Sequence, residues 1–452
     1  MTGPIVETKA GKIEGTLEKG LYVFKGIPFA APPTGELRWA SPQPVKPWPA
    51  VRPANSFGPA AVQPPSKARS IAEFAVELPQ SEDCLYLNVW SPGLYGTDRP
   101  VMVWIHGGLF TMGSGGQPTF SGDILANAGN VVVVTINYRL GAFGFLNLEQ
   151  LTGGKITATG NEGLLDQVAA LKWVKDNIAA FGGDPQNITA FGESAGAASI
   201  ECLLVMPEGY GLIQKAILQS SLGKSVRTLE QASSAAKKLL EERGIKKVDQ
   251  QALRELPALT ILEAQKSATN SGRSRGYGPV VDGKILTNFP PDAIQGGAAA
   301  GIPILAGTNL EEARLFGALD GRTTMDEKKA MSTAEQTDTN FRLPNLRLLE
   351  ARCRNREKAY RYLFNWKSPT RGGIFGACHG LEIGFVFGHF DANFCGVGPA
   401  ADRLSGQMQD AWTTFARTGD PSCESLGNWP PYCEKQITMT LGKDSGFEQE
   451  GL

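Results

Sequence analysis

The sequence of 452 residues predicts an α/β fold, with a mostly parallel central sheet flanked by helices on both faces. Short apolar runs bounded by turn residues alternate along the chain with longer helical patterns, as they do in βαβ units. Hydrophobic residues make up 42% of the chain, which is enough to bury a large core. The chain shows no internal repeat and no low-complexity linker, so we expect a single domain over residues 1–452 that carries insertions.

The expected strands are apolar runs rich in β-prone residues. They lie at roughly 85–91, 101–105, 131–137, 187–191, 214–219, 302–307 and 360–366. The helical period is clearest at 163–181, where one stripe carries Leu164, Val168, Leu171, Val174 and Ile178. We expect this stripe to belong to the core. The segments 229–268 and 325–358 are charge-rich and also helical in pattern.

Charge and targeting signals exclude several classes of protein. The net charge is −1 and no basic face is evident, so a nucleic-acid partner is not expected. No run of eighteen apolar residues occurs, which excludes a transmembrane helix. The first residues enter a strand-like run at 5–8 without a charged leader and an apolar core, and we therefore expect a cytoplasmic protein.

The cysteines are consistent with that compartment. There are seven, an odd number without the paired spacing of a metal site. We expect reduced thiols, no metal and no cofactor.

Ser194 has the sequence environment of a nucleophile on a sharp turn. It lies between Gly192 and Gly196 and directly follows the apolar run 188–191. A serine on a strand-to-helix turn adopts sparsely populated backbone angles, so residues two positions away must lack clashing side chains. With 54 glycines in the chain, this pattern alone is as easily a chance match as a site.

The segment after Ser194 strengthens the assignment. Residues 195–205 contain no proline and place apolar side chains on one helical face. A helix start presents unpaired N–H groups and a positive dipole end, which favour an alkoxide or oxyanion. The N–H group of Ala195 is therefore the first candidate donor of an oxyanion hole.

A glycine-containing loop upstream offers the remaining donors. The buried-strand run 101–105 leads into His106-Gly107-Gly108-Leu109-Phe110. We assign the further oxyanion donors to the N–H groups of Gly108 and Leu109, with Gly107 as a supporting residue of the loop.

Three histidines compete for the role of general base, because a serine nucleophile needs a group that takes its proton. His106 lies at a strand end, where a structural role is favoured. His379 and His389 both remain candidates on this argument.

Several blocks, in order along the chain, resemble the type-B carboxylesterases, the carboxylesterase/cholinesterase group of the α/β-hydrolase superfamily. The blocks are FKGIPFA at 24–30, SEDCLYLNV at 81–89, NYRLG at 137–141, GN at 160–161, LLDQ at 164–167, the turn around Ser194, ARTGDP at 416–421 and WP at 429–430. The resemblance implies an α/β-hydrolase fold, with helical insertions forming a cap over the active-site gorge. The insertions at about 225–300 and 320–375 would contribute to that cap.

The resemblance also selects among the candidate residues. It places His379 in the catalytic-histidine loop of the family, whereas His389 follows that loop and caps or packs. The family register places the acid at Glu312, and its neighbour Glu311 is then a solvated residue. The order Ser194, acid and histidine is the α/β-hydrolase order.

Three supporting or divergent positions are left open. Glu193 either tunes His379 electrostatically or has a structural role at the pocket floor. Ser220 either supports the acid through a hydrogen bond, as in the family, or is a polar strand end. Leu109 stands where the family commonly has glycine or alanine, and we expect its bulk to disfavour esters of tertiary alcohols.

The implied function is a serine carboxylic ester hydrolase that forms an acyl-enzyme with small to medium neutral esters. The same machinery could serve a carbamate, a thioester, an amide or an aromatic diester. A noncatalytic binding protein on the same scaffold is disfavoured, because the three catalytic residue types are all present. No tryptophan occurs between residues 58 and 84, which disfavours choline esters and favours a bacterial-type esterase. The expected partner is a small-molecule ester, and the expected assembly is a monomer or small homo-oligomer.

Overall fold

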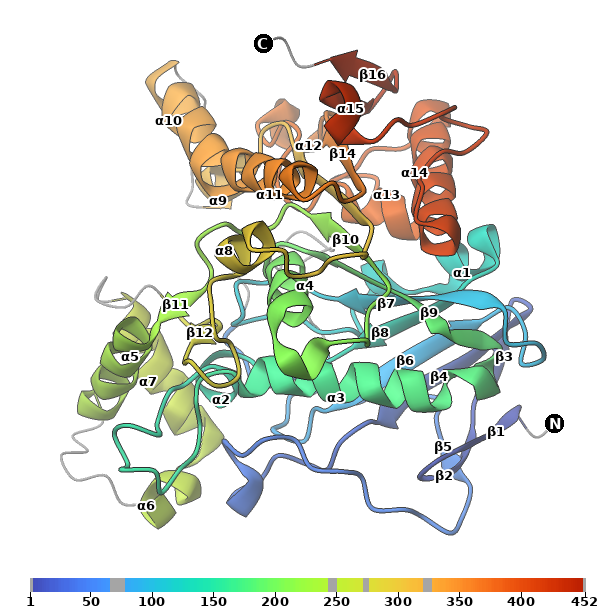
Figure 1. Cartoon of the computed structure of the whole chain (residues 1–452). Helices are drawn as coiled ribbons and strands as arrows, with labels where there is room; N and C mark the ends of the chain where they lie inside the picture. The colour runs from blue at the N-terminus through green and yellow to red at the C-terminus, as the bar shows by residue number, and fades with distance from the viewer. Residues whose placement is uncertain (1–2, 66–77, 243–249, 271–275, 320–326, 450–452) are drawn as a thin grey trace.

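The computed structural model describes residues 3–65, 78–242, 250–270, 276–319 and 327–449. Its centre is an eleven-stranded sheet with the order β16-β15-β14-β13-β10-β9-β7-β8-β6-β4-β3. Neighbouring strands from β15 to β8 are parallel, and the pairs at the two ends of the sheet are antiparallel. This is the mostly parallel sheet that the sequence predicts, and its twist is visible in Figure 1.

The strands of this sheet have the following bounds. They are β3 (Thr16–Glu18), β4 (Leu21–Pro28), β6 (Tyr86–Ser91), β7 (Arg99–Ile105), β8 (Val132–Ile136), β9 (Gly183–Glu193), β10 (Lys215–Gln219), β13 (Ile304–Asn309), β14 (Ala359–Phe364), β15 (Ile437–Leu441) and β16 (Gly446–Gln449). All seven expected strands are present, with ends that differ by a few residues. The sequence analysis did not identify the four outer strands β3, β4, β15 and β16.

The central strands are apolar throughout because both faces of the sheet are covered. In β7, alternate side chains enter two different cores: Val103 and Ile105 on one face, and Met102 and Trp104 on the other. A fully buried strand therefore appears in the sequence as a continuous apolar run.

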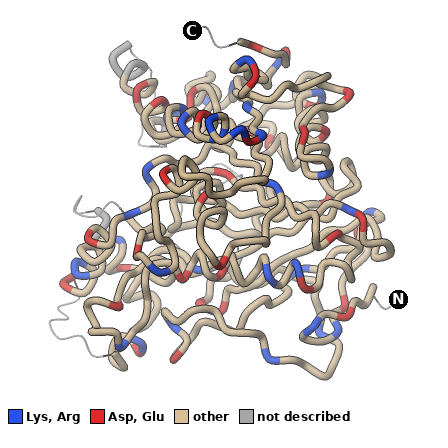
Figure 2. Tube along the Cα trace, in the orientation of Figure 1, with Lys and Arg blue, Asp and Glu red and all other residues tan. Residues whose placement is uncertain are grey.

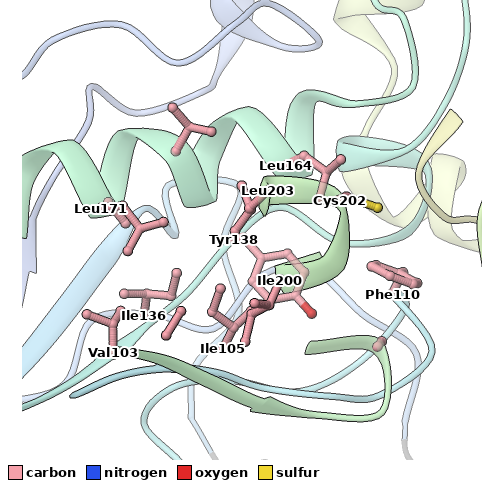
Figure 3. Close-up of a cluster of buried hydrophobic side chains, with 14 of the residues drawn as sticks. Val103, Ile105, Phe110, Ile136, Tyr138, Leu164, Leu171, Ile200, Cys202 and Leu203 are labelled. Atoms are coloured by element: carbon pink, nitrogen blue, oxygen red, sulfur yellow. The ribbon is translucent and has the colours of Figure 1, made fainter. Parts of the chain in front are cut away.

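Helices α3 (Glu162–Asn177) and α4 (Ala195–Val205) cover the face that carries Val103 and Ile105. Leu164 and Leu171 of α3 and Ile200 of α4 lie in the same buried cluster as these strand residues (Figure 3). The opposite face packs against α1 (Asp123–Gly129), α13 (Ile383–Phe387) and α14 (Pro399–Thr418). The two helical layers hold the sheet, and thus the carboxyl ends of its strands, in a fixed position.

The expected insertions are mainly helical in the residues that the structure describes. The first holds α5 (Leu229–Glu241), α6 (Gln250–Glu255), α7 (Ala258–Asn270) and α8 (Pro290–Gln295), together with the small sheet of β11 (Arg227–Thr228) and β12 (Val280–Val281). Helix α5 begins at a capping box, in which Thr228 and Gln231 satisfy each other's backbone N–H groups. The second region holds α10 (Glu327–Thr337), the π-helical turn η6 (Asp338–Arg342), α11 (Leu343–Arg354) and α12 (Thr370–Gly373), and α9 (Arg314–Leu319) precedes it.

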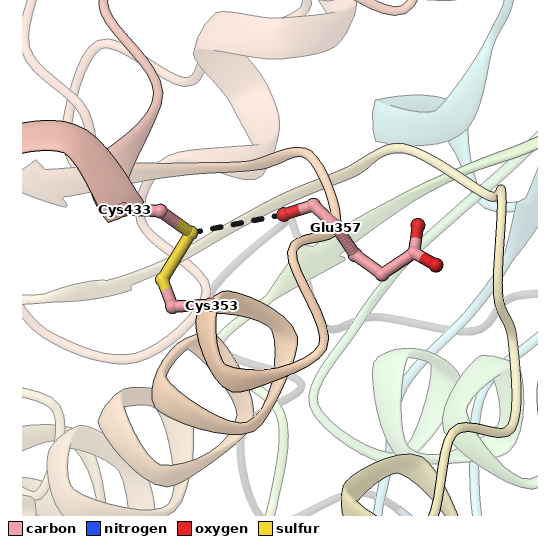
Figure 4. Close-up of a disulfide and its surroundings, with 3 residues drawn as sticks. All are labelled: Cys353, Glu357 and Cys433. Atoms are coloured by element: carbon pink, nitrogen blue, oxygen red, sulfur yellow. Dashed lines mark hydrogen bonds between the residues drawn. A yellow bond between two sulfur atoms is a disulfide. The ribbon is translucent and has the colours of Figure 1, made fainter.

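The expectation of reduced cysteines is wrong for one pair. Cys353 in α11 and Cys433 in α15 (Tyr432–Lys435) form a disulfide, with their Cα atoms 5.1 Å apart (Figure 4). The two residues are 80 positions apart in the sequence, so spacing gave no sign that the fold brings them together. The other five cysteines form no disulfide within the described residues.

Remaining features lie at the edges of the fold. A three-stranded sheet of β1 (Ile5–Thr8), β2 (Gly11–Glu14) and β5 (Arg52–Pro53) carries the N-terminal segment.

Lys and Arg residues are interspersed with Asp and Glu along the trace in Figure 2. Within the described ranges, none of the helices combines the length and the hydropathy needed to cross a bilayer.

Candidate active site

The predicted site residues follow the carboxyl ends of neighbouring parallel strands. Ser194 follows β9, Glu312 follows β13, His379 lies in the segment after β14, and the loop with Gly108 follows β7. These strands adjoin one another in the order β14-β13-β10-β9-β7. Loops at the carboxyl edge of such a sheet meet at one place, which is where α/β proteins bind their ligands.

Ser194 lies on a strained turn between β9 and α4. Its backbone angles are φ 56° and ψ −117°, a region that residues other than glycine rarely adopt. A Cβ atom at Gly192 would lie 2.7 Å from the Ile105 carbonyl oxygen, and one at Gly196 would lie 1.9 Å from the same atom. Both glycines are thus required because the end of β7 passes directly beside the turn.

His379 and Glu312 form a buried pair. His379 Nδ1 lies 2.7 Å from Glu312 Oε2, and the backbone N–H of Asn309 donates to Glu312 Oε1 at 2.7 Å. Because the carboxylate accepts, the proton of a neutral imidazole is held on Nδ1 and Nε2 is left as the basic nitrogen. The backbone N–H of His379 also donates to the backbone carbonyl of Glu312 at 3.2 Å.

A second carboxylate faces the other nitrogen of the imidazole. His379 Nε2 lies 3.0 Å from Glu193 Oε1, without hydrogen-bond geometry. Burial lowers the pKa of His379, but the attraction of Glu193 and Glu312 outweighs it and raises the pKa to about 9. Burial raises the pKa of Glu193 to about 8 and that of Glu382 to about 7. The two carboxylates therefore favour the imidazolium form of His379.

No hydrogen bond joins Ser194 to His379 among the described contacts. Ser194 is only 3% exposed, and its side chain lies beside the glycine loop, since a Cβ at Gly107 would be 3.2 Å from Ser194 Cβ. The same added atom would be 2.6 Å from Glu193 Oε2. Catalytic hydrogen bonds are often completed only when substrate binds, so this arrangement is compatible with proton transfer.

The loop after β7 has the geometry of an oxyanion-binding turn. Gly108, Leu109 and Phe110 have φ values of 106°, 56° and 59°. The N–H groups of Gly108 and Leu109 donate to no protein group in the described part of the chain, and that of Ala195 is the first in α4. All three are thus available to a ligand, and the Leu109 side chain is 45% exposed.

Other candidates from the sequence lie outside this cluster. Of the two roles left open for Ser220, the bond to the acid is not formed, because its buried Oγ has no hydrogen-bond partner among the described residues. His106 stacks on Tyr138 with ring centroids 4.5 Å apart, and burial lowers its pKa to about 4. His389 pairs with Asp123 at the start of α1. Sequence reasoning assigned structural roles to these two histidines.

Five residues near the triad were missed. Two are aromatic: the ring centroids of Phe316 and Phe341 lie 5.4 and 4.8 Å from the centroid of the His379 ring. Three are polar: Asn309, Glu382 and Gln219 form a buried hydrogen-bonded chain beside Glu312. Of these five residues, only Glu382 could have been singled out from the sequence, because it lies three residues after the proposed base.

Comparisons with known proteins agree with this geometry. The model of the carboxylesterase family matches residues 2–337 and 320–450. The para-nitrobenzyl esterase of Bacillus subtilis (strain 168) is 41% identical over 100% of this chain and 97% of its own length. The phenmedipham hydrolase of Pseudarthrobacter oxydans is 33% identical over 99% and 97%. Among solved structures, the Geobacillus stearothermophilus carboxylesterase EST55 superposes with a TM-score of 0.88, at 40% identity over 99% of this chain and 98% of that one.

Proposed function

Because this chain belongs to the carboxylesterase family and is a serine carboxylic ester hydrolase, we propose that Ser194, His379 and Glu312 carry out its reaction. The observation that supports this assignment best is the 2.7 Å contact between His379 Nδ1 and Glu312 Oε2 at the strand edge that also carries Ser194. The contact orients the imidazole and selects Nε2 as the base.

The reaction begins when His379 Nε2 removes the proton from Ser194 Oγ as the oxygen attacks the ester carbonyl carbon. The N–H groups of Gly108, Leu109 and Ala195 stabilise the negative oxygen of the tetrahedral intermediate. The intermediate then expels the alcohol, which takes its proton from the imidazolium, and leaves an acyl group on Ser194.

Deacylation repeats these steps with water as the nucleophile. His379 deprotonates the water, the second tetrahedral intermediate releases the carboxylic acid, and Ser194 regains its proton. Glu312 stabilises the imidazolium that forms in both halves of the reaction.

The proposed substrates are small to medium neutral esters. The apolar rings of Phe316 and Phe341 beside His379 support this class. Relatives named para-nitrobenzyl esterase, phenmedipham hydrolase and fumonisin B1 esterase indicate that the family accepts diverse acyl and alcohol groups. A panel of p-nitrophenyl esters of rising chain length, with a carbamate, a thioester and an amide alongside, would rank the bonds that this enzyme cleaves.

The segments 225–300 and 320–375 are proposed to form the cap. Phe341 of η6 packs on the proposed base, and Gln265 of α7 accepts a hydrogen bond from Ala142 N in α2 (Gly141–Gly144) at 2.7 Å. These contacts support a roof that is attached to the catalytic layer on two sides.

A cytoplasmic location and a monomer or small homo-oligomer complete the proposal. The five cysteines outside a disulfide support the location, because a cytoplasmic protein keeps its thiols reduced, whereas the disulfide between Cys353 and Cys433 counts against it. The balanced charge supports the expectation of no nucleic-acid partner. Cell fractionation and light scattering of the purified enzyme test these two properties.

Labelling with a fluorophosphonate followed by peptide mapping tests the catalytic assignment, because the probe reacts with an activated serine. We expect one adduct on Ser194, lost in His379→Ala and kept in the matched control His389→Ala. An adduct on a different serine would refute the assignment. No adduct on the folded protein would also refute it and favour the noncatalytic alternative.

A further inference from the structure

Asn309 occupies the junction between the segment that carries the proposed acid and the segment that carries the proposed base. It is the last residue of β13 and is completely buried. Its backbone N–H donates to Glu312 Oε1 at 2.7 Å. Its side-chain Nδ2 donates to the Cys378 carbonyl at 2.7 Å and to Glu382 Oε2 at 2.6 Å.

These bonds join parts of the chain that are distant in sequence. Cys378 immediately precedes His379, and Glu382 precedes α13; they lie 69 and 73 positions after Asn309. One residue therefore contacts the acid through its backbone and both sides of the histidine through its side chain.

The far end of this hydrogen-bonded chain is anchored in the core. Glu382 Oε1 accepts from Gln219 Nε2 at 3.2 Å, and Gln219 Oε1 accepts from Trp412 Nε1 of α14 at 3.0 Å. Trp412 and Gln219 are fully buried. Through Glu382 and Gln219, the position of Asn309 is thus fixed by α14, which packs on the face of the sheet opposite α3 and α4.

We propose that Asn309 is a positioning residue of the esterase: by bridging Glu312, Cys378 and Glu382, it sets the separation of the acid and the imidazole. This inference rests on the catalytic assignment proposed above. It adds a residue that contacts neither substrate nor reacting atoms and acts through the acid and the base.

Asparagine is well suited to this place because its amide nitrogen offers two donors in a fixed geometry. Aspartate has the same shape but would place a third carboxylate beside Glu312 and Glu382, and it could donate to neither acceptor when ionised. Other contacts between the two segments would survive the change. The N–H of Glu311 still donates to the Ala377 carbonyl at 2.9 Å, so the segments would stay joined but less precisely aligned.

The test compares Asn309→Ala, Asn309→Ser and Asn309→Asp with the control Asn147→Ala. Asn147 is a matched residue: it is buried, and its Nδ2 donates to the Thr159 carbonyl at 2.8 Å. Its Oδ1, like that of Asn309, has no hydrogen-bond partner in the described part of the chain. We measure kcat and KM with a p-nitrophenyl ester, the rate of fluorophosphonate labelling, and melting temperature. A misplaced catalytic group can cost up to about 100-fold in rate, so we expect kcat to fall about 10- to 100-fold in Asn309→Ala with little change in KM.

Asn309→Ser keeps one donor, and its kcat is expected to lie between those of the wild type and Asn309→Ala. It also provides the measurement if Asn309→Ala does not fold. Asn309→Asp should be the least active folded variant. Because the chain has only three histidines, ¹⁵N-histidine NMR gives a direct readout: the His379 Nδ1–H resonance should move in Asn309→Ala and stay in Asn147→Ala.

Two results would overturn the inference. One is that Asn309→Ala and Asn147→Ala lose the same fraction of kcat in proportion to their loss of stability. The other is an unchanged Nδ1–H resonance in an Asn309→Ala enzyme that is slow. Failure of the catalytic assignment looks different, because Ser194→Ala would then keep its activity whatever the Asn309 variants do.

Discussion

Replacement of Glu193 by glutamine should move the pH profile of the enzyme toward acid. His379 accepts a proton only when it is neutral, so kcat/KM is high above its pKa and falls below it. Glu193 Oε1 lies 3.0 Å from Nε2 and is the strongest of the attractions that raise this pKa to about 9. The raised pKa means that the neutral, basic form of the imidazole is the minor form at neutral pH.

The size of the effect follows from the same geometry. An opposite charge at this distance typically moves a pKa by about 1 to 3 units, so the half-maximal pH of kcat/KM should fall by about that amount in Glu193→Gln. The carboxylates that face His379 come from three elements, namely Glu193 on β9, Glu312 after β13 and Glu382 before α13. Since these groups titrate together, the inflection belongs to the cluster as a whole.

The assay is kcat/KM for a neutral ester from pH 5 to pH 10 at constant ionic strength. Glu201→Gln is the control: burial raises the pKa of this α4 carboxyl to about 7, but it is not among the groups that shift His379. An inflection that stays in place or moves to higher pH in Glu193→Gln would refute the reasoning. So would an equal displacement in the control.

Three further predictions concern the loop, the serine after β10 and the disulfide. Leu109→Gly keeps the N–H donor, removes a half-exposed side chain and relieves a positive φ, so the rate for a tertiary-alcohol ester relative to its primary analogue should rise; an unchanged ratio would contradict this. Ser220→Ala should leave kcat within about twofold and cost little stability, because the Ser220 hydroxyl has no partner among the described residues. Glu312→Ala, in comparison, should lose most of the activity. A large loss of activity in Ser220→Ala would show that Ser220 does contact the acid. Reduction of the Cys353–Cys433 disulfide should lower the free energy of unfolding by about 2–4 kcal/mol, measured by urea denaturation with and without dithiothreitol. Thiols counted after rapid alkylation in cells should number seven if the protein is cytoplasmic and five if the disulfide persists there.

The sequence predicted the parallel centre of the sheet because those strands are buried on both faces and appear as uninterrupted apolar runs. It did not predict the outer strands β3, β4, β15 and β16. Strand β16 is exposed along its whole length, and β15 alternates threonine with apolar residues, so neither resembles a buried run. The disulfide was also missed, because its two residues meet only after α11 and α15 have been placed.

Prediction of the candidate site shows a similar division. The turn at Ser194 can be recognised locally, because its two flanking glycines lie within five residues, although the carbonyl that requires them belongs to the distant strand β7. The contact of Glu193 with His379, and the bridge that Asn309 makes to Glu382, are polar contacts between segments far apart in the chain. For Glu193, the sequence offered His379 as one of two possible roles, and the fold shows the contact. For Asn309, nothing in the sequence pointed to Glu382, and only the fold brings the two together.

The close approach of the Ile105 carbonyl to Gly192 and Gly196 bears on how this enzyme could be diversified. A side chain at either glycine would have to displace the backbone of β7, and that displacement would carry the following loop with it. Combinatorial libraries should therefore leave these three positions constant. Leu109, whose side chain projects from the same loop into open space, is where randomisation can reshape selectivity while the scaffold keeps its stability.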